Sequence, residues 1–206
     1  MSAFDQVIGY ESIKDELMQV CDMIRNPDVY REMGAMLPRG MLLYGDPGLG
    51  KTLMEKALIR ESGLQAFVVR KNKGKKDLLG EIAKAFRKAE EQAPSIVFLD
   101  DMDKFANEDN NHRDADEYVA IQTAIDDVKD KNVFVLATVN DYRKLPGSLR
   151  RCGRFDRQIE FDSPSPADAR KIMDFVCGER KWILLSIWTI FPRCWITNPA
   201  LFWKLY

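Results

Sequence analysis

The sequence of 206 residues is poor in the side chains that bind zinc. It has one histidine, His112, and its four cysteines contain no C-x-x-C spacing. The cysteines are widely separated, at positions 21, 152, 177 and 194. A zinc site is therefore not expected, and unpaired thiols fit a reduced, cytosolic setting.

Long apolar runs and a strong net charge are also missing. No uncharged apolar stretch reaches about 18 residues, so the sequence predicts no membrane span, and its polar start shows no signal peptide. The formal net charge of -1 leaves no overall field to attract nucleic acid or an anionic membrane. What the chain does have is core material, with 46% hydrophobic residues, in a length that suits one domain or one domain plus part of a second.

Two kinds of apolar segment alternate along residues 1–178. Short buried strands are predicted over 40–44, 66–69, 96–99, 133–137 and 158–161. Amphipathic helices are predicted over 11–26, 52–61, 77–91, 118–128 and 166–176. Strands that alternate with helices at this spacing indicate an α/β fold, in which a parallel sheet is covered on both faces.

The segment from Trp182 to Tyr206 differs from the rest. All four tryptophans lie in it, and no acidic residue follows Glu179. Its apolar residues follow neither helical nor strand periodicity, and Pro192 and Pro199 interrupt it. The segment can be an unusual buried element, a membrane-surface segment, or the product of a reading frame that changed near residue 180. The prolines and a central arginine argue against a span.

A complete G-x-x-x-x-G-K-[ST] motif spans Gly45–Thr52, between a predicted strand and a predicted helix. Its glycines allow positive φ and let backbone N–H groups converge on phosphate oxygens. The N-terminus of the following helix adds its dipole. Lys51 is then expected to reach the β- and γ-phosphates, and the Thr52 hydroxyl to bind Mg²⁺. A chance match is the alternative, and the strand–loop–helix context argues against it.

Two acids and an amide follow the later apolar strands. Asp100 ends a buried strand, where a carboxylate can hold magnesium-bound water. Asp101 is then placed to polarise the attacking water. Asn140 follows the next strand, and its amide could hold that water or touch the γ-phosphate. Alone, Asn140 would be an ordinary turn residue, so its role depends on the other motifs.

Two arginines, Arg151 and Arg154, lie in a glycine-containing turn before the last predicted strand. Planar guanidinium groups suit phosphate oxygens. An arginine supplied by another subunit can also stabilise transition-state charge. A salt-bridged surface loop is the alternative, and sequence spacing does not exclude it.

Together these motifs resemble the AAA+ ATPases, in the AAA subgroup, and most closely the ATPase module of FtsH-like proteins. The likeness covers residues 4 to about 177, and its most specific part is Gly-Arg-Phe-Asp-Arg at 153–157. It implies a P-loop NTPase αβα sandwich with a five-stranded parallel sheet over 1–163. A partial helical lid with the atypical tail would follow over 164–206. The resemblance also implies a ring, usually a hexamer, with ATP between subunits.

The resemblance further implies a role for each matching residue. Nucleotide contacts fall on the N-terminal segment, the phosphate loop and the lid: Ile8, Gly9, Asp46, Pro47, Gly48, Leu49, Gly50, Lys51, Thr52, Leu53 and Ile172. Thr52 and Asp100 would hold the metal, and the catalytic group would be Asp101, Asn140 (sensor 1) and the arginine fingers Arg151 and Arg154. The implied cofactors are ATP and Mg²⁺. The implied partners are further copies of the chain and a protein substrate, with no nucleic acid, in the cytoplasm.

The sequence departs from the family pattern at several points. Asp101 stands where the family usually has Glu; one methylene less withdraws the carboxylate by ~1.5 Å, and such mispositioning can cost ~100-fold in rate. The pore-loop stretch 70–76 is basic and lacks an aromatic residue. No H-E-x-x-H occurs, so the chain is not the zinc-protease half. We also expect no membrane anchor before residue 4, and a lid that stops after one helix.

Three functions therefore remain open from the sequence. The first is ATP hydrolysis in a ring that remodels a protein partner. The second is a nucleotide-responsive scaffold or binding subunit with little turnover, which Asp101 and the aromatic-free pore loop favour. The third is a truncated or frame-shifted chain that folds its core without assembling.

Overall fold

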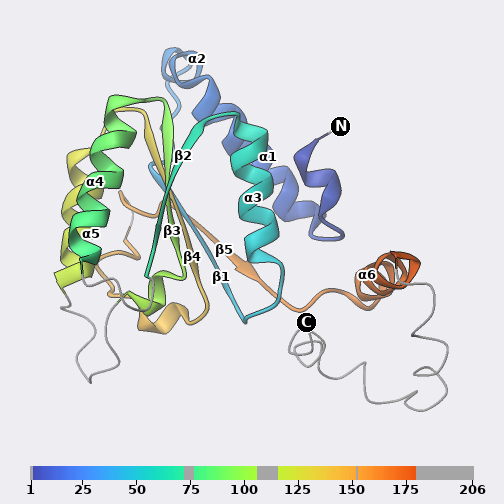
Figure 1. Ribbon diagram of the computed structural model, residues 1–206. Coiled ribbons are helices and arrows are strands. Elements are labelled where there is room, and N and C mark those ends of the chain that lie inside the picture. Colours follow the sequence, from blue (N-terminus) through green and yellow to red (C-terminus); the bar gives the residue numbers. More distant parts are fainter. Residues whose placement is uncertain (1, 72–76, 106–115, 152, 180–206) are drawn as a thin grey trace.

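A parallel sheet of five strands forms the centre of the computed structural model, which describes residues 2–71, 77–105, 116–151 and 153–179 (Figure 1). The strands are β1 (Gly40–Gly45), β2 (Gln65–Arg70), β3 (Ser95–Asp100), β4 (Val133–Val139) and β5 (Arg157–Phe161). Their order is β2-β3-β4-β1-β5. The predicted α/β fold of a P-loop NTPase, with five parallel strands, is confirmed.

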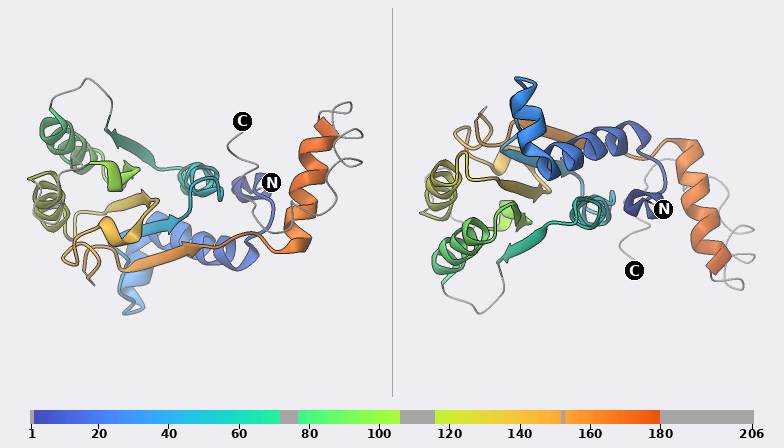
Figure 2. Two further views of the ribbon diagram at one scale, coloured as in Figure 1. Left: turned by 90° about the horizontal axis from the view of Figure 1, so that it is seen from below. Right: turned by 90° about the horizontal axis from the view of Figure 1, so that it is seen from above.

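Both faces of the sheet are covered by helices, which explains why its central strands are apolar without alternation. The covering helices are α1 (Glu11–Arg25), α3 (Lys51–Ser62), α4 (Leu78–Glu91) and α5 (Asp116–Asp127). Figures 1 and 2 show α4 and α5 together on one side and α1 and α3 on the other. Along β1, Leu42 packs in the core under α4 and α5, while Met41 and Leu43 pack under α1 and α3.

The segment after α1 contains a helix that was not expected from the sequence. The Asn26-Pro27 pair does end α1, because the residue before a proline disfavours helical geometry. A second helix, α2 (Pro27–Glu32), then begins at the proline itself. Proline suits the first helical position, where a backbone N–H would have no partner within the helix. The sequence pattern predicts a helix over 11–26 and does not predict this second helix. Short 3-10 turns lie at η1 (Ala3–Gln6), η2 (Met102–Lys104) and η4 (Tyr142–Lys144).

Helix α6 (Pro166–Glu179) lies apart from the two helical layers and beside the N-terminal segment (Figures 1 and 2). Gly9 has φ +78°, and a Cβ added there would lie 3.0 Å from the Asp168 side chain. The Tyr10 hydroxyl donates to the Asp162 carbonyl at 2.8 Å. These contacts join the start of the chain to the start of α6. We propose residue 163 as the boundary between the sheet domain and the lid.

Several features singled out in the sequence lie outside the described residues. They are most of the basic pore-loop stretch (72–76), His112 and the tail from Trp182. Among the helices of the described ranges, none is long and apolar enough to cross a membrane.

Candidate functional site

The motifs for phosphate, metal and water meet at one edge of the sheet. Strand β4 lies between β1 and β3, and all three run in the same direction. Gly45, Asp100 and Asn140 therefore stand at or just beyond the carboxyl ends of neighbouring strands. Ligands of open α/β sheets bind outside these ends, so this edge is the candidate nucleotide site.

The phosphate loop has the backbone shape that its glycines permit. Gly48 and Gly50 have φ of +87° and +90°, in the region that favours glycine. Gly50 is the N-cap of α3, and among the described residues no side chain caps this helix start. The first N–H groups of α3 are thus free to bind an anion. Within the loop and first turn, Leu49 is buried, whereas exposed side chains belong to Asp46, Pro47, Thr52 and Leu53.

Lys51 lies folded into this loop. Its ammonium donates to the Gly45 carbonyl at 2.6 Å and to the Asp46 carbonyl at 2.9 Å. Burial lowers the pKa of Lys51, and the carboxylates of Asp101, Asp103 and Asp46 oppose that shift. A charge-assisted bond to phosphate is stronger than a bond to a neutral carbonyl. The ammonium is therefore placed to exchange these two carbonyls for phosphate oxygens.

Asp101 and Asn140 lie side by side beyond β3 and β4. The Asn140 side-chain amide donates to Asp101 Oδ1 at 3.0 Å. Lys104 Nζ lies 2.5 Å from Asp101 Oδ2, and this bond raises the pKa of Lys104. The Asp101 backbone is left-handed, with φ 51°, and its N–H donates to Thr138 Oγ1 at 3.0 Å. An amide and an ammonium thus hold the carboxylate proposed to act on water.

Asp100 is 7% exposed and has partners on both carboxylate oxygens. The Thr138 hydroxyl donates to Oδ1 at 3.1 Å. Arg70, opposite Asp100 in the β2–β3 register, donates to Oδ2 through both Nε and Nη2 at 2.5 Å. A carboxylate and an exposed threonine hydroxyl are oxygen donors of the kind that Mg²⁺ prefers. The donor chemistry of Thr52 and Asp100 therefore fits a magnesium ion, which stays a proposal, and the Arg70 guanidinium already lies against Asp100.

A third carboxyl group, Glu55, lies close enough to Asp100 to interact with it electrostatically. It is on α3, one turn after Lys51, and is 4% exposed. Burial and the Asp100 carboxylate raise the pKa of Glu55 to about 7, while Lys56 and Arg70 lower it. Among the described residues it has no hydrogen-bond or ion-pair partner. Buried acids without a partner are costly, so this position is unusual.

The residues expected on the adenine side come from both ends of the described chain. Ile8 is half-buried and Gly9 is buried against Asp168, the contact described above. Ile172 is half-buried on α6, four residues after Asp168 and therefore on the same helix face. The structure brings the N-terminal segment and α6 together, and an adenine site between them is a proposal.

The two proposed arginine fingers differ in their surroundings. Arg151 is exposed. Arg154 forms an ion pair with Asp126 of α5, with Nη2 2.7 Å from Oδ2, and Nη1 donates to the Ser148 carbonyl at 2.7 Å. Within a single chain, Arg154 thus belongs to a salt-bridged surface loop, which is the alternative that the sequence left open. A role for Arg154 in a neighbouring subunit requires that this ion pair open.

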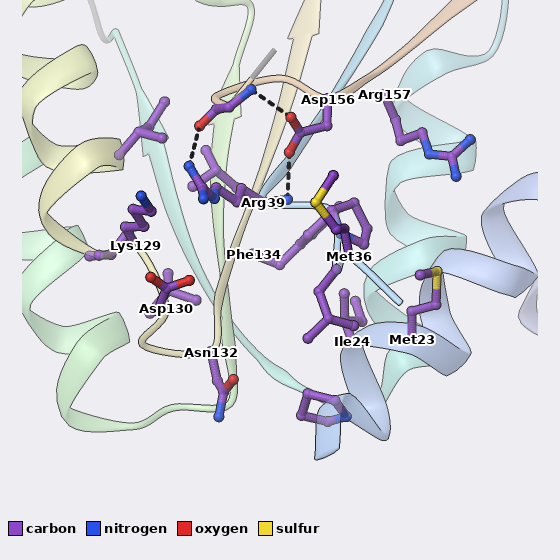
Figure 3. A pocket seen from close by; sticks show the side chains of 18 of the residues that line it. Met23, Ile24, Met36, Arg39, Lys129, Asp130, Asn132, Phe134, Asp156 and Arg157 are labelled. Carbon is purple, nitrogen blue, oxygen red and sulfur yellow. Dashed lines mark hydrogen bonds between the residues drawn. The ribbon is translucent and has the colours of Figure 1, made fainter. Parts of the chain in front are cut away.

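Hydrogen bonds from Asp156 and Arg39 hold the base of the loop that carries Arg151 and Arg154, which we call the finger loop (Figure 3). Asp156 accepts the Gly153 N–H at 2.6 Å and the Arg39 N–H at 2.9 Å, and Arg39 Nη1 donates to the Gly153 carbonyl at 3.3 Å. A cavity of about 610 Å³ borders these residues, lined also by Met36 and Phe134. It lies at the amino ends of the strands, so this large cavity is not the nucleotide site.

Four residues of the site were missed from the sequence: Glu55, Arg70, Lys104 and Thr138. Thr138 carried a signal, because a hydroxyl inside a fully buried strand needs a partner. Glu55 carried a weaker one, since it shares a helix face with Lys51. The pairing of Arg70 depends on strand register, and that of Lys104 on a 3-10 turn. Neither had a recognisable pattern.

Comparison with known proteins agrees with this geometry. Residues 41–163 match the family described as "ATPase family associated with various cellular activities (AAA)". The matched range begins in β1 and ends two residues after β5. It therefore includes the phosphate loop, both strand-end acids and the finger loop.

Relatives with named functions are similar over most of this chain. "ATP-dependent zinc metalloprotease FtsH 2" of Sphaerobacter thermophilus is 34% identical over 83% of the chain and 28% of its own length. The protein named "ATP-dependent zinc metalloprotease FtsH" is 35% identical in Leptotrichia buccalis (78% of the chain, 22% of the relative). In Acidothermus cellulolyticus it is 32% identical (86% and 28%). The chain thus spans about a quarter of the length of these curated relatives.

Proposed function

This chain belongs to the AAA family of ATPases and resembles the ATPase region of FtsH, and on that premise we propose that it binds and hydrolyses ATP with Mg²⁺. The observation that carries the proposal is the phosphate loop, where an uncapped helix start and the Lys51 ammonium converge in front of two strand-end acids. An arrangement of this kind suits a nucleoside triphosphate.

Each residue then has a task in hydrolysis. The N–H groups of 48–52 and the Lys51 ammonium bind the β- and γ-phosphates. Thr52 and Asp100 hold Mg²⁺, which when bound neutralises charge on the phosphate oxygens. Asp101 accepts a proton from the attacking water, and Asn140 orients that water or the γ-phosphate. Lys104 holds the Asp101 carboxylate in place. Because its ammonium occupies one of the two oxygens of this proposed base, a tight bond would hinder proton transfer from water.

We also propose a ring, a hexamer as is usual in the family, in which Arg151 and Arg154 act on ATP held by a neighbour. The finger loop supports this, because Asp156 fixes its base while Arg151 is exposed. The remaining proposals are a protein partner that the ring remodels, no binding of nucleic acid, and a cytoplasmic location. These rest on the family and on the near-neutral charge.

A second function has a specific observation in its favour. Asp101 is shorter than the usual Glu, and both of its oxygens are engaged within the chain. Both features favour a subunit that binds nucleotide and changes its assembly, but hydrolyses slowly or not at all. Such a chain would act as a nucleotide-responsive scaffold.

Steady-state phosphate release with Mg-ATP, measured beside mass photometry of the same sample, tests the proposal. Release that EDTA abolishes, together with assemblies larger than the monomer, supports a ring ATPase. Nucleotide-dependent assembly without release supports the scaffold. A monomer that neither assembles nor releases phosphate would overturn both.

A further inference from the structure

The Arg70–Asp100 pair places a protein cation on the carboxylate that is proposed to serve Mg²⁺. Arg70 is the last residue of β2 and its side chain is 57% exposed, whereas that of Asp100 is 10% exposed. Both guanidinium contacts fall on Oδ2, and Thr138 holds Oδ1. In this structure Asp100 is therefore neutralised and fully engaged by residues of its own chain.

Glu55 is a candidate second acceptor for the same guanidinium. It is 4% exposed, has no partner among the described residues, and interacts electrostatically with both Asp100 and Arg70. The Arg70 guanidinium is therefore bound to Asp100 and lies within electrostatic range of a second carboxyl group. An arginine that leaves Asp100 can remain beside a carboxylate by turning to Glu55, which keeps part of the favourable charge interaction.

We propose that Arg70 is an internal counter-cation that neutralises Asp100 when no divalent metal is bound and moves toward Glu55 when Mg²⁺ takes its place. Arg70 is thus a positioning residue that sets how much Mg²⁺ the site requires. The inference rests on the proposed function, since Asp100 is taken as the metal-binding acid. It adds to that function the expectation that the chain still binds nucleotide when Mg²⁺ is scarce.

The exchange predicts that the effect of Arg70→Gln on nucleotide affinity depends on Mg²⁺. Without Mg²⁺, the parent chain keeps Asp100 neutral, so the carboxylate repels phosphate little. Arg70→Gln leaves Asp100 charged, so in EDTA this variant should bind nucleotide about tenfold more weakly. In saturating Mg²⁺ no arginine competes, and the variant should bind as well as the parent or better. Its Mg²⁺ midpoint should fall about tenfold, because one charge-assisted contact no longer opposes the metal.

The test is a titration of a fluorescent ADP analogue into full chains, in EDTA and over a range of Mg²⁺ concentrations. ADP avoids any signal from hydrolysis. Arg70→Lys keeps the charge but loses the two-pronged contact, so its midpoint should fall between those of the parent and Arg70→Gln. Glu55→Gln removes the second acceptor and should raise the midpoint. Arg87→Gln is the matched control, because it removes an arginine from a surface pair with Glu91 on α4.

The outcomes separate the inference from the function beneath it. A parent chain that binds no ADP analogue at any Mg²⁺ concentration overturns the proposed function, and the inference with it. A parent that binds, with an Arg70→Gln midpoint within twofold of the parent and no weakening in EDTA, overturns the inference alone. An equal shift in Arg87→Gln would also overturn it, because overall charge would then explain the effect.

Discussion

The phosphate loop differs in construction from the acid edge of this site, by which we mean Asp100, Asp101 and the side chains that bind them. The loop is made of main chain: glycines with positive φ and the open start of α3 form it, and the Asp46 and Pro47 side chains are exposed. The acid edge is made of side chains, with Arg70 on Asp100 and Lys104 on Asp101. Nucleotide binding should therefore tolerate most side-chain changes, while metal dependence and turnover should respond to single substitutions.

The largest effect is expected at the finger loop. Arg154→Ala should lower phosphate release by about 10³-fold and leave nucleotide affinity unchanged, because an arginine finger acts on transition-state charge. Phosphate release and a fluorescent-ATP titration on the same preparation measure the two effects.

Mixing experiments decide whether Arg154 acts between subunits. A mixture of Arg154→Ala and Lys51→Ala chains pairs an intact site in one subunit with an intact finger in another. Recovery of ATPase above either variant alone is the expected result. If an active parent gives mixtures with no recovery, the trans role is wrong.

The next effect concerns stability and pH, through Glu55. Its pKa is raised from an ordinary value of 4.5 to about 7, so the folded chain binds a proton more tightly than the unfolded chain. Stability should therefore fall as pH rises through this range, by at most about 3 kcal/mol above pH 7. Glu55→Gln should be more stable than the parent at pH 8, and this advantage should shrink toward pH 4.5.

Urea unfolding at pH 5 and pH 8 measures the effect of Glu55. Glu61→Gln is the control, because the pKa of Glu61 is shifted in the opposite direction. The Ala3 N–H and the Ser2 hydroxyl donate to Glu61 and lower its pKa. That variant should gain no stability at pH 8. An equal difference between Glu55→Gln and the parent at both pH values would show that the buried acid does not titrate as described.

A smaller effect is expected where the acid edge departs from the family. Asp101→Glu restores the missing methylene and should raise phosphate release by up to ~100-fold, because ångström-scale placement of a catalytic group can cost that much. Nucleotide affinity should change little. Unchanged or lower release in Asp101→Glu would show that the surroundings, including Lys104 and Asn140, are adapted to the shorter side chain.

The smallest effect is expected on the loop itself. Asp46→Asn alters an exposed side chain, while the contact to Lys51 comes from the Asp46 carbonyl and is retained. Nucleotide affinity should change by less than about threefold, the size of a weak surface electrostatic effect. A loss of tenfold or more would show that side chains shape this loop after all.

These two regions also differ in how far the sequence predicts them. The loop is predictable because its motif encodes backbone geometry directly, as is the sheet, whose fully apolar strands signal burial on both faces. The cations that pair with Asp100 and Asp101 were not predictable, because Arg70 reaches Asp100 only through strand register and Lys104 reaches Asp101 through a 3-10 turn. Helix α2 was missed for a local reason: Pro27 is compatible both with a helix end and with a helix start.

The central claim is that Lys51 and the phosphate loop bind ATP, and titration of a fluorescent ATP analogue in Mg²⁺ tests it most directly. Lys51→Ala should weaken binding by about 100-fold, as expected for a lost bond between an ammonium and a phosphate. Lys56→Ala, which removes an exposed lysine from the same helix, should bind like the parent. Equal affinity of Lys51→Ala and the parent would contradict the account.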